Sequence, residues 1–321
     1  MTIDIRPSIF SVGSELGDNR ILLTCDEVSL YFELRNGRLW SLSSTYPLPV
    51  DMPEQTRQRE HCALLRIAGP NDTDCFMELE RCLASSLREP VRALDMGTGC
   101  GEWVVNMAVA LPEVHFYGID IVPIFTRCAL PNVRFELQDL NDDLYYPDQH
   151  MDVVRAHDVS LGVERFPNLI SEAARILKYG GVLSICEWQR CIHINDGSDI
   201  AIRAPKACAF LMALTQHLHV NYGISPVVSS VKVAIEQEPN LAALHHEFSI
   251  PIGDWPVDAF MRSVGTRYRQ VLVGYAIAMI PFLTRVLRAE DVDDLVGGFI
   301  SDLYYVRGLS TTYYSGYAIR I

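Results

Sequence analysis

The amino-acid sequence predicts an α/β protein built on a doubly wound, mostly parallel sheet. From residue 91 onward, apolar strand-like runs alternate with segments of helical apolar spacing, the pattern of successive β–α–β units. The strand-like runs are nearly continuous in apolar residues, as expected for strands covered on both faces. With 321 residues, 49% of them hydrophobic, the chain can bury a substantial core around such a sheet.

The elements of this sheet are expected in a regular order. The first strand is "VRALDMG", followed by the helix "EWVVNMAVAL". The next three strands are "VHFYGID", "VRFELQD" and "MDVVRAHD", and each ends in an acid. The helix "FPNLISEAARILK" stops at Gly180–Gly181, and "GVLSICEW" is the fifth strand. Ligands of parallel sheets bind beyond the carboxyl ends of the strands, so one edge should carry the strand-end polar residues Asp95, Asp120, Asp139, His157 and Asp158.

The two ends of the chain differ from this central pattern. In "YFELRNGRLWSL", Asn36–Gly37 between apolar residues predicts a tight hairpin. Residues 199–240 and 257–306 have mainly helical spacing, and they are expected to form a cap over the ligand edge. A strand through "HHEFSIPIG" is expected within that cap, and "TYYSGYAIRI" should close the chain as a strand.

Composition limits the classes of partner and compartment. The net charge of −13 and pI near 5.1 argue against nucleic acid or an anionic membrane as the main partner. Nine cysteines without a CxxC pair favour a reducing compartment over a disulfide framework or a zinc site. The N-terminal "MTIDIRPSIF" lacks a signal-peptide pattern, and the apolar run Val271–Leu283 is too short for a membrane span. We therefore expect a soluble cytoplasmic protein.

The stretch "LDMGTGCGEW" predicts a nucleotide site. Gly97, Gly99 and Gly101 allow a tight turn and a close approach of the backbone to a ligand, with the next helix directing N–H groups at it. Asp120 ends the second strand, where a carboxylate can accept hydrogen bonds from both ribose hydroxyls. Dinucleotide sites and S-adenosylmethionine sites share these features.

Asp95 and the glycine spacing separate the two kinds of site. A carboxylate at the start of the turn would repel a diphosphate but would favour the ammonium and sulfonium of S-adenosylmethionine. The third glycine follows the second by two residues, not by three as in the dinucleotide fingerprint. Asp139 and Leu140 follow the third strand, where they can meet an adenine ring. The alternative, that the three acids are solvated strand ends, is less favoured because all three are spaced correctly around the glycines.

On these motifs the sequence resembles the class I S-adenosylmethionine-dependent methyltransferases, and more narrowly the LaeA-like group of fungal secondary metabolism. "YPLPVD", "GIDIVPI", "EAARILKYGGVLSICE" and the downstream "IPIGDWP" carry the narrower resemblance. The sequence departs from this group at His157, Tyr179 and Glu102, where the family commonly has arginine, proline and an apolar residue.

The resemblance implies a seven-stranded Rossmann-like sheet with an antiparallel C-terminal strand. It divides the chain into an N-terminal hairpin and lid (1–60), a cofactor-binding core (61–190), a helical cap with an inserted strand (191–312) and the last strand (313–321). The lid implies that Tyr46 and Arg57 contact the cofactor. The expected cofactor contacts are Tyr46, Arg57, Asp95, Gly97, Thr98, Gly99, Gly101, Asp120, Ile121, Asp139, Leu140 and His157.

Methyl transfer needs a base only when the acceptor loses a proton. His157, at the end of the fourth strand, is the candidate base because its ordinary pKa lies near neutrality, although it could instead cap a loop or hold the cofactor. Glu187 and Trp188 at the end of the fifth strand, and His217 and Tyr222 in the cap, are candidates for contacting the acceptor. No metal is expected, because the acids of "AEDVDDL" suit the start of a helix and no second cluster accompanies them.

The leading hypothesis is an enzyme that methylates a small molecule, with a natural-product hydroxyl or carboxylate oxygen as the acceptor. The alternative is a regulator of secondary metabolism that binds S-adenosylmethionine and acts through a protein partner. A nicotinamide-dependent oxidoreductase is disfavoured by Asp95 and by the glycine spacing. The sequence gives no indication of the acceptor's identity or of the oligomeric state.

Overall fold

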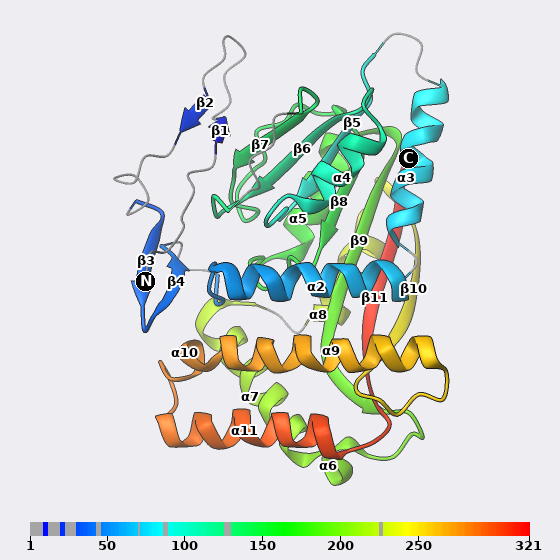
Figure 1. Ribbon diagram of the computed structural model, residues 1–321. Coiled ribbons are helices and arrows are strands. Elements are labelled where there is room, and N and C mark those ends of the chain that lie inside the picture. The colour runs from blue at the N-terminus through cyan, green and yellow to red at the C-terminus, as the bar shows by residue number, and fades with distance from the viewer. Residues whose placement is uncertain are drawn as a thin grey trace.

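The computed structural model describes residues 9–11, 20–22, 30–42, 46–69, 71–85, 89–124, 130–224 and 227–321. The N-terminal stretch on which the absence of a signal peptide was predicted lies outside them, apart from Ile9 and Phe10. A seven-stranded sheet forms the centre, in the order β10-β11-β9-β8-β5-β6-β7. Figure 1 shows helices on both faces of this sheet and a layer of helices beyond one edge.

Five strands of this sheet are parallel to one another. They are β5 (Arg92–Met96), β6 (His115–Asp120), β7 (Val133–Leu137), β8 (Met151–His157) and β9 (Leu177–Ile194). The last strand, β11 (Leu309–Arg320), runs antiparallel to β9, from Leu309 opposite Ile194 to Ile319 opposite Val182. The predicted doubly wound, mostly parallel sheet with an antiparallel C-terminal strand is therefore confirmed.

Strand β10 (Leu241–Pro251) corrects the expected domain plan. It pairs antiparallel with β11 along its whole length, from Leu241 opposite Arg320 to Pro251 opposite Ser310. This strand is thus the edge of the central sheet and not an insertion within a helical cap. The local sequence pattern identified a strand but carried no information about a partner about 60 to 80 residues further along.

Two pairs of helices cover the faces of the sheet. On one face, α3 (Asn71–Ser85) and α4 (Glu102–Ala110) pack Leu79 and Val104 against Ala93 and Phe116. On the other face lie α5 (Phe166–Ile176) and α8 (Val227–Gln237), which share one core with the inward side of β8 and β9. Helix α8 was expected in the cap, but its buried Val231 places it on the sheet. Side chains alternate along a strand, so neighbouring residues of one strand pack against helices on opposite faces of the sheet.

The remaining helices form a separate layer beyond the carboxyl ends of the parallel strands. They are α2 (Met52–Ala68), α6 (Ile200–Arg203), α7 (Pro205–Tyr222), α9 (Ala259–Ala278), α10 (Ile280–Leu283) and α11 (Ala289–Tyr305). Helix α2 runs beside α9, between that helix and the sheet (Figure 1). Phe210 of α7 packs on Phe299 of α11, with ring centroids 4.4 Å apart. No helix among the described residues has the length and apolar character needed to cross a membrane.

Near the N-terminus, two short two-stranded sheets precede α2. The pair β1 (Ile9–Ser11) and β2 (Arg20–Leu22) is one, and β3 (Phe32–Arg35) with β4 (Arg38–Ser41) is the other. The turn between β3 and β4 has positive φ at both Asn36 (51°) and Gly37 (74°), as a two-residue type I′ turn requires. The predicted hairpin is confirmed. Its Phe32 packs with Val50 and Val122, which joins the hairpin to the entrance of α2 and the end of β6.

Candidate active site

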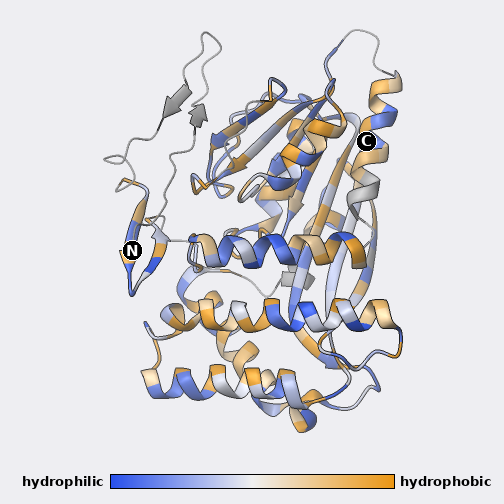
Figure 2. Ribbon diagram, viewed as in Figure 1, coloured by the Kyte–Doolittle hydropathy of each residue, from blue (hydrophilic) through white to orange (hydrophobic). Residues whose placement is uncertain are grey.

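A cavity of about 220 Å³ lies where the sheet edge meets α2 and α9. It exceeds the roughly 150 Å³ of an apolar protein cavity that holds benzene. Its walls come from the glycine turn after β5, the segments at the ends of β6, β7 and β8, the middle of β9, the helix α2 from Arg57 onward and one side of α9. The first half of α2 is mainly hydrophilic and the second half mainly hydrophobic (Figure 2). Both parts of the helix reach the cavity, with Arg57 and Gln58 from the hydrophilic half and Cys62 and Leu65 from the hydrophobic half.

Gly97 and Gly99 of the glycine turn line the cavity, and only Gly99 of the three glycines has open space beside it. Gly97, Gly99 and Gly101 all have positive φ, at 69°, 56° and 76°, a conformation that costs other residues about 1–2 kcal/mol. A Cβ on Gly97 would lie 2.6 Å from a Val159 methyl, and one on Gly101 would lie 2.4 Å from the Phe135 ring. At Gly99 the nearest atom would be 3.8 Å away. Gly99 is thus the point at which the backbone can approach a ligand closely.

Acidic residues at the ends of β6 and β7 line the same cavity. The backbone N–H groups of Gly99 and Val122 donate to opposite oxygens of Asp120, at 2.8 and 3.0 Å, and burial raises the pKa of Asp120 to about 6. Each carboxylate oxygen can accept more than one hydrogen bond, which suits Asp120 to a ribose diol. Asp139 accepts from the backbone and side-chain amides of Asn141, each at 2.9 Å. Ile121 and Leu140, the residues after these two acids, also line the cavity.

Asp95 has a cationic partner that sequence analysis missed. Its carboxylate is buried and accepts from Thr98 Oγ1 at 2.9 Å and from Arg155 Nη1 at 2.7 Å. The Arg155 guanidinium also lies 5.0 Å from the centre of the Trp103 ring. Arg155 lies two residues before His157, so both side chains are on the same side of β8. This spacing was the signal in the sequence that Arg155 could reach the site. The attraction of Asp95 for a cationic ligand is therefore weaker than the sequence alone implies.

The predicted lid is the segment that enters α2. Asp51 caps the helix by accepting from the Glu54 amide at 3.2 Å and is held by Arg38 at 2.9 Å. Arg57 donates to the buried Glu54 at 2.6 Å. Gln58, from the next position, donates to Tyr46 Oη at 3.1 Å and also lines the cavity, as do Tyr46 and Arg57. The structure thus brings Tyr46 and Arg57 to the cavity, as the resemblance implied.

His157 ends β8 as predicted, but β9 continues past Glu187 and Trp188 to Ile194, so the predicted end of the fifth strand is wrong. His157 lines the cavity, but its Nε2 meets Ser184 Oγ at 3.2 Å, and burial, reinforced by Arg155, lowers its pKa well below the ordinary value. Glu187 is fully buried beneath the cavity and does not line it. Its oxygens accept the backbone N–H groups of Val159 and Ser160 at 2.9 and 3.3 Å. Glu187 therefore holds the loop after β8 and is not placed to touch an acceptor.

Trp188 is the one predicted acceptor contact that reaches the cavity. Its indole N–H donates to Thr311 Oγ1 at 2.6 Å, and its ring meets Tyr275 edge to face with centroids 5.2 Å apart. His217 and Tyr222 lie on α7 and do not line the cavity, which corrects that expectation. The Tyr222 hydroxyl accepts from Arg285 Nη1 at 2.9 Å. The reason is that α7 packs against α11, while α2 and α9 cover the site.

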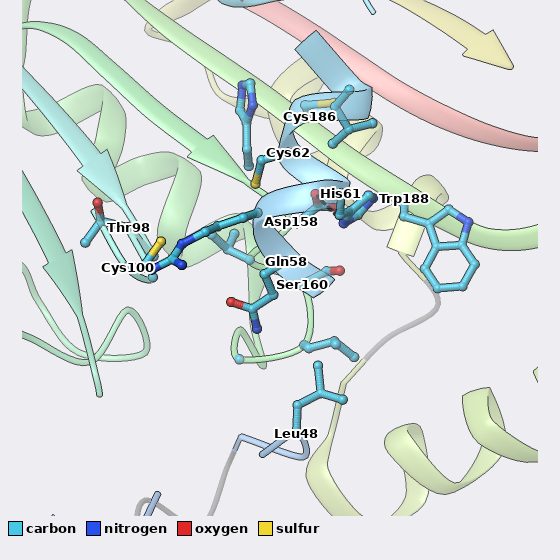
Figure 3. Close-up of a pocket in the computed structure, with 18 of the residues that line it drawn as sticks. Leu48, Gln58, His61, Cys62, Thr98, Cys100, Asp158, Ser160, Cys186 and Trp188 are labelled. Atoms are coloured by element: carbon cyan, nitrogen blue, oxygen red, sulfur yellow. Dashed lines mark ion pairs between the residues drawn. The ribbon is translucent and has the colours of Figure 1, made fainter. Parts of the chain in front are cut away.

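A group of side chains absent from the predicted set lies beside Trp188. His61 of α2 shares a 2.5 Å hydrogen bond through Nε2 with Tyr313 Oη of β11, and the hydroxyls of Tyr313 and Tyr268 are 2.8 Å apart. His61 Nδ1 lies 3.7 Å from an oxygen of Asp158. Figure 3 shows His61 and Asp158 between Thr98 and Cys100 on one side and Trp188 on the other. The sequence indicated that His157 and Asp158 end a strand. It did not indicate that His61, Tyr268 and Tyr313 would lie beside Asp158.

These residues fit S-adenosylmethionine better than a dinucleotide. A diphosphate would occupy the N-terminus of α4, but the first residue of that helix is the acidic Glu102, which lines the cavity. Asp120, Asp139 and Gly99 line the same cavity, and the contacts of Asp120 with a ribose and of Asp139 with an adenine stay predictions. When bound, S-adenosylmethionine supplies a methyl group on a positively charged sulfur. Within the described residues, no group of three or more histidine, cysteine, aspartate or glutamate side chains could hold a metal ion.

Comparison with known proteins agrees with this geometry. Residues 87–201 match a protein family described as "Methyltransferase domain". The chain is 34% identical over 164 residues to the "Secondary metabolism regulator laeA" of Coprinopsis cinerea, which covers 50% of this chain and 40% of that protein. It is 27% identical over 247 residues to "Methyltransferase pytC" of Aspergillus terreus, covering 74% and 71%. The chain therefore spans less than half the length of the first of these relatives.

Among solved structures, the Haemonchus contortus phosphoethanolamine N-methyltransferase 2 in complex with S-adenosyl-L-methionine aligns with a TM-score of 0.42 at 13% identity, covering 83% of this chain and 57% of that one. The strand order, the glycine turn with its acids and the family match lead to one conclusion. Residues 87–201 match the methyltransferase domain family, their sheet and glycine turn fit S-adenosylmethionine as the cofactor, and the chain is similar to fungal proteins of the LaeA-like group.

Proposed function

We propose that this chain transfers a methyl group from S-adenosylmethionine to an oxygen atom of a small molecule in fungal secondary metabolism. The observation that carries the proposal is the continuity of the cavity. One space extends from Gly99 and Asp120, at the nucleoside end, to Trp188 and Tyr268 at the other end, under the cover of α2 and α9. A covered space of this kind suits a small acceptor better than a segment of another macromolecule.

The similar proteins support a role in fungal secondary metabolism, and the cysteines support a location in the cytoplasm. One similar protein is named a fungal methyltransferase and another a regulator of secondary metabolism. Cys62 and Cys100, both in the cavity wall, are free thiols, which favours the reducing cytoplasm. Alignment of the reactants and exclusion of water are the enzyme's main tasks, because the methyl group is already activated by the sulfonium.

A second candidate function is a regulator that binds S-adenosylmethionine without turnover. Of the two relatives described, the laeA protein has the higher sequence identity to this chain, and it is named a regulator. Such a role would need the same nucleoside contacts at Gly99 and Asp120. It would not need a space for a small acceptor beside Trp188.

Calorimetry followed by a turnover assay separates the two candidates. S-adenosylhomocysteine should bind the purified chain, and radiolabelled methyl groups should pass to members of a panel of phenols, alcohols and aromatic acids. Asp120→Ala is the matched negative variant. Binding with no transfer to any acceptor, in the presence or absence of fungal extract, would favour the regulator. Failure of the nucleoside to bind would remove both candidates.

A further inference from the structure

Asp158 lies between the expected nucleoside contacts and the side chains at the Trp188 end of the cavity. The sheet order places β7, β6 and β5, which carry Asp139, Asp120 and the glycine turn, on one side of β8. On the other side follow β9 and β11, which carry Trp188 and Tyr313. Asp158 directly follows β8, between the two groups (Figure 3). It is therefore located where an acceptor would meet the methyl group.

Asp158 is held in a conformation that few residues adopt. Its φ of 55° lies in the left-handed region, which is uncommon for side chains other than glycine and is enriched at functional sites. Its backbone N–H donates to Cys186 O at 2.8 Å. The next two backbone N–H groups, of Val159 and Ser160, are fixed by the buried Glu187. The loop is thus anchored from below, and the Asp158 carboxylate is directed to the cavity wall.

A chain of hydrogen-bonding side chains stands behind the carboxylate. His61 Nδ1 faces Asp158 at 3.7 Å, and its Nε2 shares the 2.5 Å hydrogen bond with Tyr313, which in turn meets Tyr268 at 2.8 Å. Three elements far apart in sequence, α2, α9 and β11, supply these groups. Tyr268 and Tyr313 are at most 1% exposed, so the orientation of the imidazole is well determined. His61 arrives with α2, the helix that covers the cavity.

The charges around Asp158 favour a carboxylate that takes and releases protons near neutrality. Burial raises its pKa, against the opposing effect of the Arg57 and Arg155 guanidinium groups and a hydrogen bond from the Trp188 amide. Burial, with Arg57, lowers the pKa of His61 to about 3, so the imidazole is neutral and acts as a hydrogen-bonding partner. The charged and titratable groups that act on Asp158 or are acted on by it are Arg57, His61, Cys62, Arg155, Glu187, Tyr268, Tyr275 and Tyr313.

We propose that Asp158 is the catalytic base, which accepts the proton of a hydroxyl group on an aromatic or alicyclic acceptor, and that His61 is a positioning residue for it. The cavity that Asp158 lines also has Trp188, Tyr275, Phe248, Val271 and Leu272 in its walls, which suits a flat or apolar framework. This proposal rests on the proposed function and names its acceptor: a hydroxyl compound, because a carboxylate acceptor has no proton to give and would be repelled by Asp158.

The proposed step balances in atoms and charge. The acceptor's O–H bond breaks and its proton passes to an oxygen of Asp158. A bond forms between the acceptor oxygen and the methyl carbon, and the bond from that carbon to sulfur breaks with its electron pair remaining on sulfur. The positive charge of the sulfonium is thereby lost, and the proton on Asp158 leaves to solvent after the product departs. Neither an oxidant nor a reductant is needed.

The test compares Asp158→Asn with Asp254→Asn, a control whose side chain is 73% exposed outside the cavity. Asparagine tolerates the left-handed conformation, so the loop should keep its shape. With phenols as acceptors, Asp158→Asn should lower kcat about 100-fold, the scale of general-base catalysis, and leave S-adenosylhomocysteine affinity within about twofold. The loss should shrink as the acceptor phenol becomes more acidic. The control should behave as the natural chain does.

Two further measurements separate a proton acceptor from a structural residue. The rate of the natural chain should rise with pH through the neutral range, this rise should vanish in Asp158→Asn, and in His61→Leu it should move to another pH. Binding of 4-nitrophenol with S-adenosylhomocysteine present needs no methyl transfer. Above the pKa of this phenol, Asp158→Asn should bind it several-fold more tightly, because a carboxylate no longer repels the phenolate.

The outcomes distinguish this proposal from the broader one. Transfer to phenols with an unchanged rate and pH profile in Asp158→Asn would overturn the role of Asp158 and leave the proposed methyl transfer intact. Transfer to carboxylates alone would overturn the acceptor class. If no acceptor is methylated at all, the proposed function fails. The binding test still applies in that case: equal nitrophenolate binding by the natural chain and Asp158→Asn would overturn the role of Asp158.

Discussion

The glycine turn offers a sharp test of the site, because two of its glycines have the same backbone conformation and different surroundings. Gly99 and Gly101 have φ values of 56° and 76°. A methyl group at position 101 would lie 2.4 and 2.6 Å from two carbons of the Phe135 ring, whereas one at position 99 would point into the cavity with its nearest neighbour, Gln58 Oε1, at 3.8 Å. Alanine at either position should therefore disturb different properties.

The expected magnitudes follow from these contacts. Both substitutions force alanine into the left-handed region, at about 1–2 kcal/mol of folding stability each. Only Gly101→Ala adds a clash, with a ring that is itself packed against Gly118, and overpacking of this kind costs about 1–3 kcal/mol. We therefore expect the unfolding free energy to fall by about 2–5 kcal/mol for Gly101→Ala and by about 1–2 kcal/mol for Gly99→Ala.

Cofactor binding should show the reverse order. The Gly99→Ala methyl group would occupy space needed by the ligand, so affinity for S-adenosylhomocysteine should fall at least tenfold, or about 1.4 kcal/mol. Urea denaturation measures the first property and calorimetry the second, at a temperature where both variants are folded. Equal destabilisation by the two substitutions would refute the packing argument at Phe135. Unchanged nucleoside affinity in Gly99→Ala would refute the placement of the cofactor against this turn.

Three other predictions address single side chains. Asp120→Ala should weaken S-adenosylhomocysteine binding by about 1–3 kcal/mol, the usual loss for unpaired buried polar groups; unchanged affinity in calorimetry would mean that the ribose contact is misassigned. Glu187→Ala should lower the unfolding free energy by about 2–4 kcal/mol because two buried N–H groups lose their acceptor. Glu187→Gln keeps an acceptor and should lower the unfolding free energy less. Equal decreases would contradict the role of Glu187 in holding the loop after β8. Because desolvation lowers the pKa of the mostly buried His61 to about 3, the unfolded chain binds a proton that the folded chain does not, and stability should be lost as pH falls from about 6.5 towards 3. His61→Gln should flatten this dependence in urea titrations at several pH values, and an identical slope would count against a buried neutral imidazole.

Local sequence patterns were sufficient for the parallel core and the nucleoside end of the site. The apolar runs and the glycine turn depend on neighbours within one or two turns of chain, so their consequences can be derived from residues close in sequence. The helix stop predicted at Gly180–Gly181 is wrong, because α5 ends at Ile176 and both glycines lie in β9. Asp120, Asp139, Gly99 and the Asn36–Gly37 hairpin all belong to this class. Each lies at a strand end or in a turn whose geometry is set by adjacent residues, and the structure places the three site residues in one cavity.

The acceptor end and the outer parts of the fold depended on contacts between distant residues. His61 and Tyr313 are 252 residues apart, and β10 pairs with a strand at the end of the chain. Asp95 pairs with Arg155 of β8, and Glu187 accepts a hydrogen bond from the loop after β8 instead of lining the cavity. The sequence by itself determined which segments become strands and which glycine turn lines the cavity, because these follow from local periodicity and backbone freedom. Only the tertiary structure decided which charges are paired and which distant side chains line the cavity, because those depend on which distant elements pack together.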